Sequence, residues 1–223
     1  HFGEQEPEPA LAAVPQRWLA ELPGQCLANL HLWVLDTKAF GNGSLVKHVL
    51  YEETLVASTV ADGFAEVYTD FAVHADGFSR MVLLAGTMAP RRLGRLVQRL
   101  LEIETYRMAA LLGLPAAREA SHVLASAEGE LAELAQAIRS ATREDEPMLL
   151  DRLTRLAGAV ESQHAATHSR FSASAAYFEL LDKRIAEISE SRLPGMQTIG
   201  EFMDRRLTPA RSTCAWSAKR QDA

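Results

Sequence analysis

Residues 148–191 read MLLDRLTRLAGAVESQHAATHSRFSASAAYFELLDKRIAEISES, a run in which apolar residues recur every three or four positions and proline is absent. This spacing is typical of one face of an α-helix. At a rise of ~1.5 Å per residue, a helix over this run would be on the order of 65 Å long. Because one small core cannot cover a helix of that length, we expect it to pack against other helices.

The apolar face of this predicted helix follows a heptad pattern. Its positions, called the heptad seam below, are Leu149, Leu153, Leu156, Val160, His164, Thr167, Phe171, Ser174, Phe178, Leu181, Ile185 and Ile188. The steps alternate between three and four residues, except for two successive steps of four that end at His164. A pattern of this kind is typical of coiled coils and predicts an elongated coiled-coil-like bundle and a chain that self-associates.

Three side chains near this irregularity are candidate ligands for a divalent metal ion. Glu161, His164 and His168 occupy positions i, i+3 and i+7 of the predicted helix, an arrangement that metal sites in helical bundles use. The stretch lacks the HExxH glutamate that would act as a base. The alternative interpretation is that these polar residues weaken the seam or fix its register. No other cofactor is predicted.

The sequence on both sides of this run predicts further helices. Apolar residues recur at helical spacing over residues 89–113, 116–140 and 198–220, approximately, with proline or glycine near the boundaries. Together with the helix at about 147–191, they predict an elongated helical domain over residues 89–223.

Residues 1–88 predict a small α+β domain. The tetrapeptide ADGF occurs twice, at 61–64 and 75–78, between runs rich in valine, phenylalanine, tyrosine and threonine. Asp-Gly supplies the positive φ angles that tight turns need, so these runs predict a three-stranded antiparallel meander. Upstream we expect a loose lead-in at 1–10, a short helix at 11–22, a strand within 26–37 and a loop at 41–44. The expected fold class is α+β, mainly helical, with a small antiparallel sheet followed by long antiparallel helices.

Four arginines, Arg91, Arg92, Arg95 and Arg99, begin the predicted helix at 89–113. They are candidate interaction residues for an anion or an acidic lipid. The alternative is a solvated helix face with pairs such as Arg99 and Glu102. Positive charges at a helix start oppose the helix dipole, which leaves a partner for them open.

Catalytic signatures are missing from the sequence. It contains no phosphate-binding loop, no GxGxxG after a strand and no GxSxG, so no catalytic residue is assigned and an enzyme is the less favoured interpretation. The polar residues Asp70 and His74 are interpreted as turn chemistry. A hydrolase with an unrecognised site would need a deep polar pocket lined by Asp70, His74 or Glu102.

Composition excludes some classes of function. The chain has 223 residues, 48% of them hydrophobic and 23% charged, with a formal net charge of −6, so binding of nucleic acid is not expected. Two distant cysteines predict neither a disulfide framework nor a cysteine zinc site, and a reducing compartment fits them best. No run reaches the roughly 18 apolar residues of a membrane span. Both chain ends lead us to expect a part of a longer polypeptide.

Three stretches carry a resemblance: EVYTDFAVHADGFSR at 66–80, RRLGRLVQRLLEIETYRMAALLGLP at 91–115 and LPGMQTIGEFMDRRLTPARSTC at 193–214. From about Trp33 onward, the sequence resembles domain of unknown function family 3422, a bacterial family of predicted membrane-anchored proteins. The resemblance implies an inner-membrane anchor in a C-terminal segment beyond this sequence, with the present chain soluble and cytoplasmic. It brings no catalytic residues.

The leading hypothesis is therefore a region of a bacterial membrane-anchored protein that acts by protein–protein contacts, as a homo-oligomer or with another protein. One alternative is the cytoplasmic domain of a CorA-like divalent-cation transporter or a metal-responsive protein, although the Gly-Met-Asn signature is not in this chain. The other alternative is the hydrolase described above.

Overall fold

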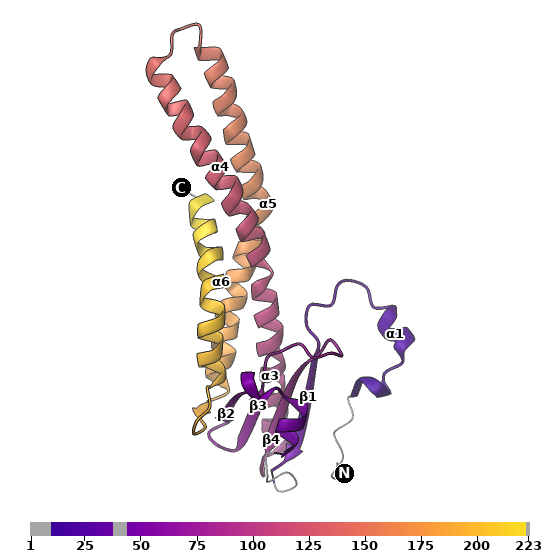
Figure 1. Cartoon of the computed structure of the whole chain (residues 1–223). Coiled ribbons are helices and arrows are strands. Elements are labelled where there is room, and N and C mark those ends of the chain that lie inside the picture. Colours follow the sequence, from indigo (N-terminus) through magenta and orange to yellow (C-terminus); the bar gives the residue numbers. More distant parts are fainter. Residues whose placement is uncertain (1–9, 38–43, 222–223) are drawn as a thin grey trace. The chain divides into compact units, whose positions relative to one another are not determined.

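The computed structural model describes residues 10–37 and 44–221 (Figure 1). Apart from Ala10 and Ser44, the lead-in predicted at 1–10 and the loop predicted at 41–44 lie outside the described residues. The chain is α+β and mainly helical, as predicted.

The described strands form one mixed sheet in the order β1-β4-β3-β2-β5. Their bounds are β1 (Leu30–Asp36), β2 (Val56–Val60), β3 (Ala65–Thr69), β4 (Ser79–Ala85) and β5 (Ser191–Arg192). The predicted meander is confirmed, because β3 pairs antiparallel with both β2 and β4. The prediction of a purely antiparallel sheet is wrong, because β1 pairs parallel with β4.

The parallel pairing of β1 has no local signal in the sequence. Parallel strands cannot be joined by a tight turn, so no turn motif marks the pairing of Trp33 with Val82. Alternate residues of β1 are buried, and a cluster joins β1 and β4 to the unpredicted short helix α2 (Ser44–Val49). The buried members of this cluster are Trp33, Leu35, Val46, Val49, Leu50, Val82 and Leu84. Burial of these side chains stabilises the edge of the sheet that β1 forms.

The described helices include four long ones, close to their predicted ranges. These are α3 (Pro90–Leu111), α4 (Gly113–Ser140), α5 (Glu146–Glu187) and α6 (Ile199–Gln221). Shorter elements are η1 (Ala10–Ala13), α1 (Gln16–Ala20) and η2 (Glu52–Thr54). The predicted break around Gly113 and Pro115 narrows to the single residue Leu112, since a proline in the first helical turn removes no helical hydrogen bond. No described helix has a stretch long and apolar enough to span a membrane.

The end of α5 comes earlier than predicted, at Glu187 instead of about residue 191. Ser189 has a φ of 48°, outside the helical region, and Ser191 and Arg192 then pair with β2 as β5. The Glu190 carboxylate accepts hydrogen bonds from the backbone N–H groups of Ile199 and Gly200 at the start of α6. A carboxylate there complements the helix dipole, so this turn also fixes where α6 begins.

The chain divides into two compact units. Unit 1 comprises residues 1–108 and 180–206, and unit 2 comprises 109–179 and 207–223. The boundary predicted near residue 88 separates two domains. The division into units does not test that boundary, so it stays a prediction. In unit 2, α4 and α5 run antiparallel and are joined by the turn at 141–145 (Figure 1).

The heptad seam coincides with the buried face of α5. The buried residues of α5 are Leu149, Thr167, Phe171, Ser174, Phe178 and Leu181, and all of them are seam positions. Seam positions 153–164 are only partly buried or exposed. The pattern in the sequence therefore identified the inward face of this helix.

Candidate functional site

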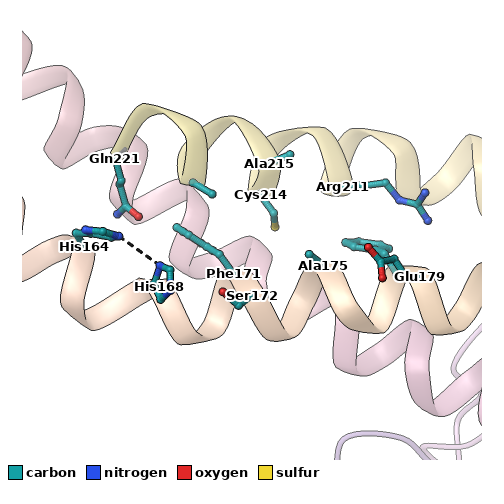
Figure 2. Close-up of a pocket in the computed structure, with 12 residues that line it drawn as sticks. His164, His168, Phe171, Ser172, Ala175, Glu179, Arg211, Cys214, Ala215 and Gln221 are labelled. Atoms are coloured by element: carbon teal, nitrogen blue, oxygen red, sulfur yellow. Dashed lines mark hydrogen bonds between the residues drawn. The ribbon is translucent and has the colours of Figure 1, made fainter. Parts of the chain in front are cut away.

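A groove in unit 2 contains two of the predicted metal candidates. It has a volume of about 430 Å³ and lies between α5 and α6. Its lining residues are His164, His168, Phe171, Ser172, Ala175, Phe178, Glu179, Arg211, Cys214, Ala215, Ala218 and Gln221. The central part is apolar, and Figure 2 shows His164 and His168 at one end with Glu179 and Arg211 at the other. We call it the helical groove.

Different contacts hold the side chains at the two polar ends of the helical groove. At one end the Nε2 atom of His164 lies 3.3 Å from the Nδ1 atom of His168, and the Gln221 amide donates to the hydroxyl of Thr167 at 2.8 Å. At the other end the Arg211 guanidinium lies 4.8 Å from the ring centroid of Phe178, a distance at which a cation–π interaction forms. The groove can therefore contact an amphipathic surface.

Cys214 lies in the wall of the groove, in surroundings that favour the protonated thiol. Burial raises the pKa of the thiol, and a hydrogen bond with Ser174 offsets part of that shift. A protonated, buried thiol packs as a small apolar group and reacts slowly.

The metal candidates are brought together only in part. His164 and His168 are neighbours, but Glu161 does not line the groove. A second Glu-x-x-His motif, Glu119 and His122 of α4, does not line it either. Among residues 10–37 and 44–221, no group of three or more His, Cys, Asp or Glu side chains is arranged to hold a metal ion.

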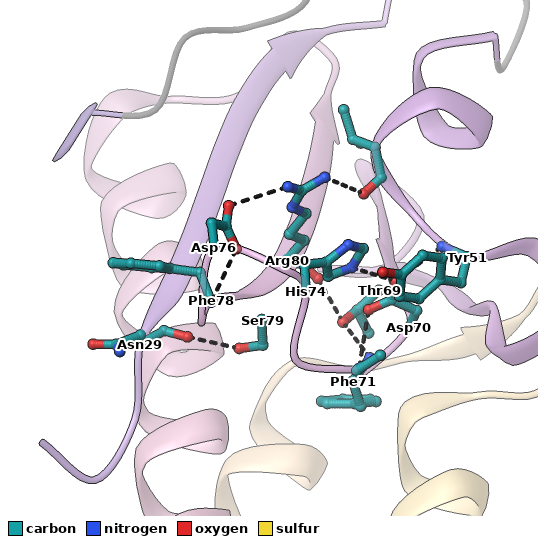
Figure 3. A network of polar contacts seen from close by, with 12 residues as sticks. Asn29, Tyr51, Thr69, Asp70, Phe71, His74, Asp76, Phe78, Ser79 and Arg80 are labelled. Carbon is teal, nitrogen blue, oxygen red and sulfur yellow. Dashed lines mark hydrogen bonds and ion pairs between the residues drawn. The ribbon is translucent and has the colours of Figure 1, made fainter. Parts of the chain in front are cut away.

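Asp70 and His74 form a buried pair in unit 1 (Figure 3). The Asp70 carboxylate lies 2.7 Å from Nε2 of His74. It also accepts hydrogen bonds from the backbone N–H groups of Tyr51 and Ala72, at 2.9 and 3.1 Å. The Tyr51 ring stacks on the His74 ring at 4.2 Å. Because the carboxylate is occupied by loop backbone and by His74, its arrangement is that of a group that orders the β3–β4 connection.

A second histidine lies on the same side of the sheet as Arg80. The His31 ring stacks on the Phe78 ring at 4.0 Å, and its Nε2 atom lies 3.7 Å from the Asp76 carboxylate. Arg80 also binds the Asp76 carboxylate (Figure 3). Burial lowers the pKa of His31; Asp76 opposes this shift and Arg80 adds to it. Burial raises the pKa of Asp76, but the Phe78 N–H and Arg80 together hold it below its usual value.

Three of the four predicted interaction arginines line one cavity of about 260 Å³ in unit 1. We call it the arginine pocket. Its lining residues are Ala61, Asp62, Arg92, Arg95, Leu96, Arg99, Glu187, Ile188 and Ser189, so Arg91 is outside it. The pair expected between Arg99 and Glu102 is replaced: Arg99 binds Glu187, and Glu102 binds Arg184.

The acidic partners in the arginine pocket were missed at the level of sequence. Asp62 follows β2, and Glu187 ends α5, far along the chain from Arg92 and Arg99. Only the spacing of the arginines, which share one helical face, could have indicated the cavity. None of the cavities described above is lined by Asp70, His74 or Glu102.

The comparisons with known proteins bear on the family. A family model described as "Protein of unknown function (DUF3422)" matches residues 2–223. Neither the curated proteins nor the solved structures give a match. Because the match runs over residues 2–223, the chain belongs to this protein family, DUF3422.

Proposed function

We propose that the protein is a non-enzymatic binding protein that associates with a second copy of itself through the closing end of the α4–α5 hairpin. One observation carries this proposal: large apolar side chains on this end are 39–65% exposed. They are Leu131 and Ile138 of α4 and Met148, Leu150 and Leu153 of α5.

In unit 2, the ribbon of α6 ends before the closing end of the α4–α5 hairpin (Figure 1). Leu134 and Leu149 are buried between the helices and hold the hairpin together. The exposed residues therefore are not needed for the hairpin itself. Several large apolar side chains exposed at one end of a hairpin are the kind of surface that protein interaction sites present.

The charges beside these residues are balanced within the hairpin. The Arg152 guanidinium lies 3.6 Å from the Glu130 carboxylate and 3.9 Å from the Glu133 carboxylate, and Arg155 pairs with Asp151 at 3.0 Å. Because these charges already have partners, they do not oppose the packing of two hairpins related by a two-fold axis. Both helices also carry apolar residues to the same interface, which supplies the main driving force.

Sedimentation velocity over a range of concentrations tests the proposal. We expect the chain to dimerise, and we expect the double substitution Ile138→Glu with Leu150→Glu to give a monomer. Its melting temperature should equal that of the wild type at concentrations where both chains are monomeric. Leu101→Glu is the matched control, because Leu101 is similarly exposed but lies in unit 1. A wild-type chain that stays monomeric at millimolar concentration contradicts the proposal.

A metal-responsive role is the second candidate, and the histidine pair favours it. Two nitrogen ligands of a tetrahedral zinc ion, each at ~2.0–2.1 Å, lie about 3.4 Å apart. The 3.3 Å between His164 and His168 is close to this separation. Calorimetry with zinc, nickel and cobalt ions, with His164→Ala and His168→Ala as controls, tests it; no heat with the wild-type chain rejects it.

Membrane attachment, which the family resemblance implies, stays a prediction. Fractionation of cells that carry the complete gene product tests it. Recovery of that product entirely in the soluble fraction would contradict membrane attachment.

A further inference from the structure

The geometry points to a binding site for a phosphoryl group in the arginine pocket, centred on Arg95. This site is separate from the hairpin surface proposed for self-association. The ligand class is a small phosphomonoester or inorganic phosphate.

The outer two arginines of the pocket are held in place by the protein itself. Arg92 donates to the Asp62 carboxylate at 2.7 Å and to the Ala61 carbonyl at 2.9 Å, and its guanidinium lies 4.5 Å from the Phe64 ring centroid. Arg99 binds the Glu187 carboxylate at 3.2 Å and its carbonyl at 3.0 Å. These contacts fix both walls of the pocket.

Arg95 lies between them on the same face of α3, but it differs from them in its contacts. In the part of the chain that the structure describes, no hydrogen bond or ion pair is recorded for Arg95, although it lines the pocket. Its guanidinium offers five donors in a planar fork that fits a phosphoryl or carboxylate group. Ser189 lines the same cavity, and its hydroxyl also has no recorded partner among the described residues. Both residues are exposed, so a ligand can reach them from solvent.

The local charge of the pocket favours an anion. Three arginines face two acidic residues, so the pocket is net positive although the whole chain has a formal net charge of −6. Such local fields attract counter-charged ligands to a cleft. The Asp62 side chain is largely exposed, so its pair with Arg92 is screened by solvent and can be shared with an incoming anion.

Size and oxygen count favour phosphoryl over other anions. A volume of about 260 Å³ is below the ~300–1,000 Å³ of pockets for drug-sized ligands, which suits a small molecule. A phosphoryl group carries about −1.5 to −2 charges at neutral pH and three acceptor oxygens. Two oxygens can take the fork of Arg95, and the third remains for the Ser189 hydroxyl. The apolar Leu96 and Ile188 close the inner side of the pocket.

Isothermal titration of the full chain with inorganic phosphate and with glycerol phosphate tests this inference. Sodium chloride at matched ionic strength is the blank, because it screens charge without offering phosphoryl oxygens. We expect both phosphoryl compounds to bind and the blank to give no heat. No heat from either compound at millimolar concentration overturns the inference.

Two charge-matched variants separate the pocket from the general field of α3. Arg95→Gln is expected to weaken binding ~10- to 100-fold, because it removes a bidentate, charge-assisted contact. Arg91→Gln removes the same charge from the same helix but lies outside the pocket, so its affinity should change less than ~3-fold. Both residues are exposed and neither has a recorded hydrogen bond or ion pair within the described chain, so both variants should fold. Equal losses in the two variants overturn the inference.

The phosphoryl group could belong to a free metabolite or to a lipid headgroup. Co-sedimentation with vesicles containing phosphatidic acid distinguishes the two sources, with glycerol phosphate as the competitor. If glycerol phosphate displaces the protein from the vesicles with the affinity measured by calorimetry, the free phosphomonoester and the lipid headgroup bind in the same pocket. Vesicle binding that is lost equally in Arg91→Gln and Arg95→Gln contradicts it.

Discussion

The two units of the chain differ in how their exposed apolar side chains are distributed. Both units contain buried polar side chains with partners: Asp70 of unit 1 binds His74 and two backbone N–H groups, and Thr167 of unit 2 binds Gln221. The large exposed apolar side chains of unit 1, such as Trp18, Val73 and Leu101, are spread over the sequence, whereas most of those in unit 2 lie at the closing end of the α4–α5 hairpin. That end therefore presents a surface that a partner can cover.

Among the changes considered, removal of the Asp70 carboxylate should lower the unfolding free energy the most. Asp70→Ala leaves two backbone N–H groups and His74 without their acceptor, so we expect a loss of about 3–5 kcal/mol in unfolding free energy. Urea denaturation measures it. Asp70→Asn keeps one acceptor oxygen and should cost less; a loss below about 1 kcal/mol for the alanine variant would show that this carboxylate does not order the loop.

A pair of glycines tests how tightly the helices of unit 2 pack. A Cβ atom at Gly113 would lie 2.7 Å from the Ser174 hydroxyl and 3.2 Å from the Cys214 sulfur, so Gly113→Ala should destabilise by about 1–3 kcal/mol. Nothing lies within 4 Å of the corresponding position at Gly129, where alanine should stabilise the helix by about 0.5–1 kcal/mol. Thermal unfolding measures both changes. Changes of the same sign would contradict this packing.

His31 should make the stability of unit 1 depend on pH. Its pKa in the folded chain lies below 6.5, the ordinary value for histidine, so the unfolded chain binds more protons just below that pH. The free energy of unfolding is therefore highest above pH 6.5 and decreases as the pH falls from 6.5 through the lower pKa of the folded chain. Urea denaturation between about pH 7.5 and about pH 5 should show this slope, and His31→Phe should flatten it. An identical slope in the variant would exclude His31 as its source.

The smallest effect on stability is expected at the hairpin surface. Leu150→Gln should change the unfolding free energy of the monomer by less than about 0.5 kcal/mol, because Leu150 is 65% exposed. Measurement at low protein concentration keeps association out of the result. A loss above about 1 kcal/mol would show that Leu150 belongs to the fold of unit 2 and is not reserved for a partner.

The parts of the fold that the sequence predicted are those with local signals. The two Asp-Gly turns indicated the meander, and helical spacing indicated the four long helices. The parallel partner of β1 and the two-residue β5 depend on pairing between distant segments, so no turn or periodicity could reveal them.

The candidate sites follow the same division. Arg92, Arg95 and Arg99 share a helical face by spacing alone, and so do His164 and His168. Asp62 and Glu187, which pair with the outer arginines, come from elements far away in the chain. Tertiary structure alone could show that Arg95 is the member without a recorded partner in the described chain.

The chain's two cysteines differ in exposure, so the rates at which a thiol reagent modifies them can measure local opening of the structure. Cys26 is exposed, whereas Cys214 is buried in the α5–α6 packing of unit 2. A thiol reagent should modify Cys26 at once and Cys214 only when that packing opens. The rate of the slow modification then reports the free energy of local opening in unit 2, separately from global unfolding.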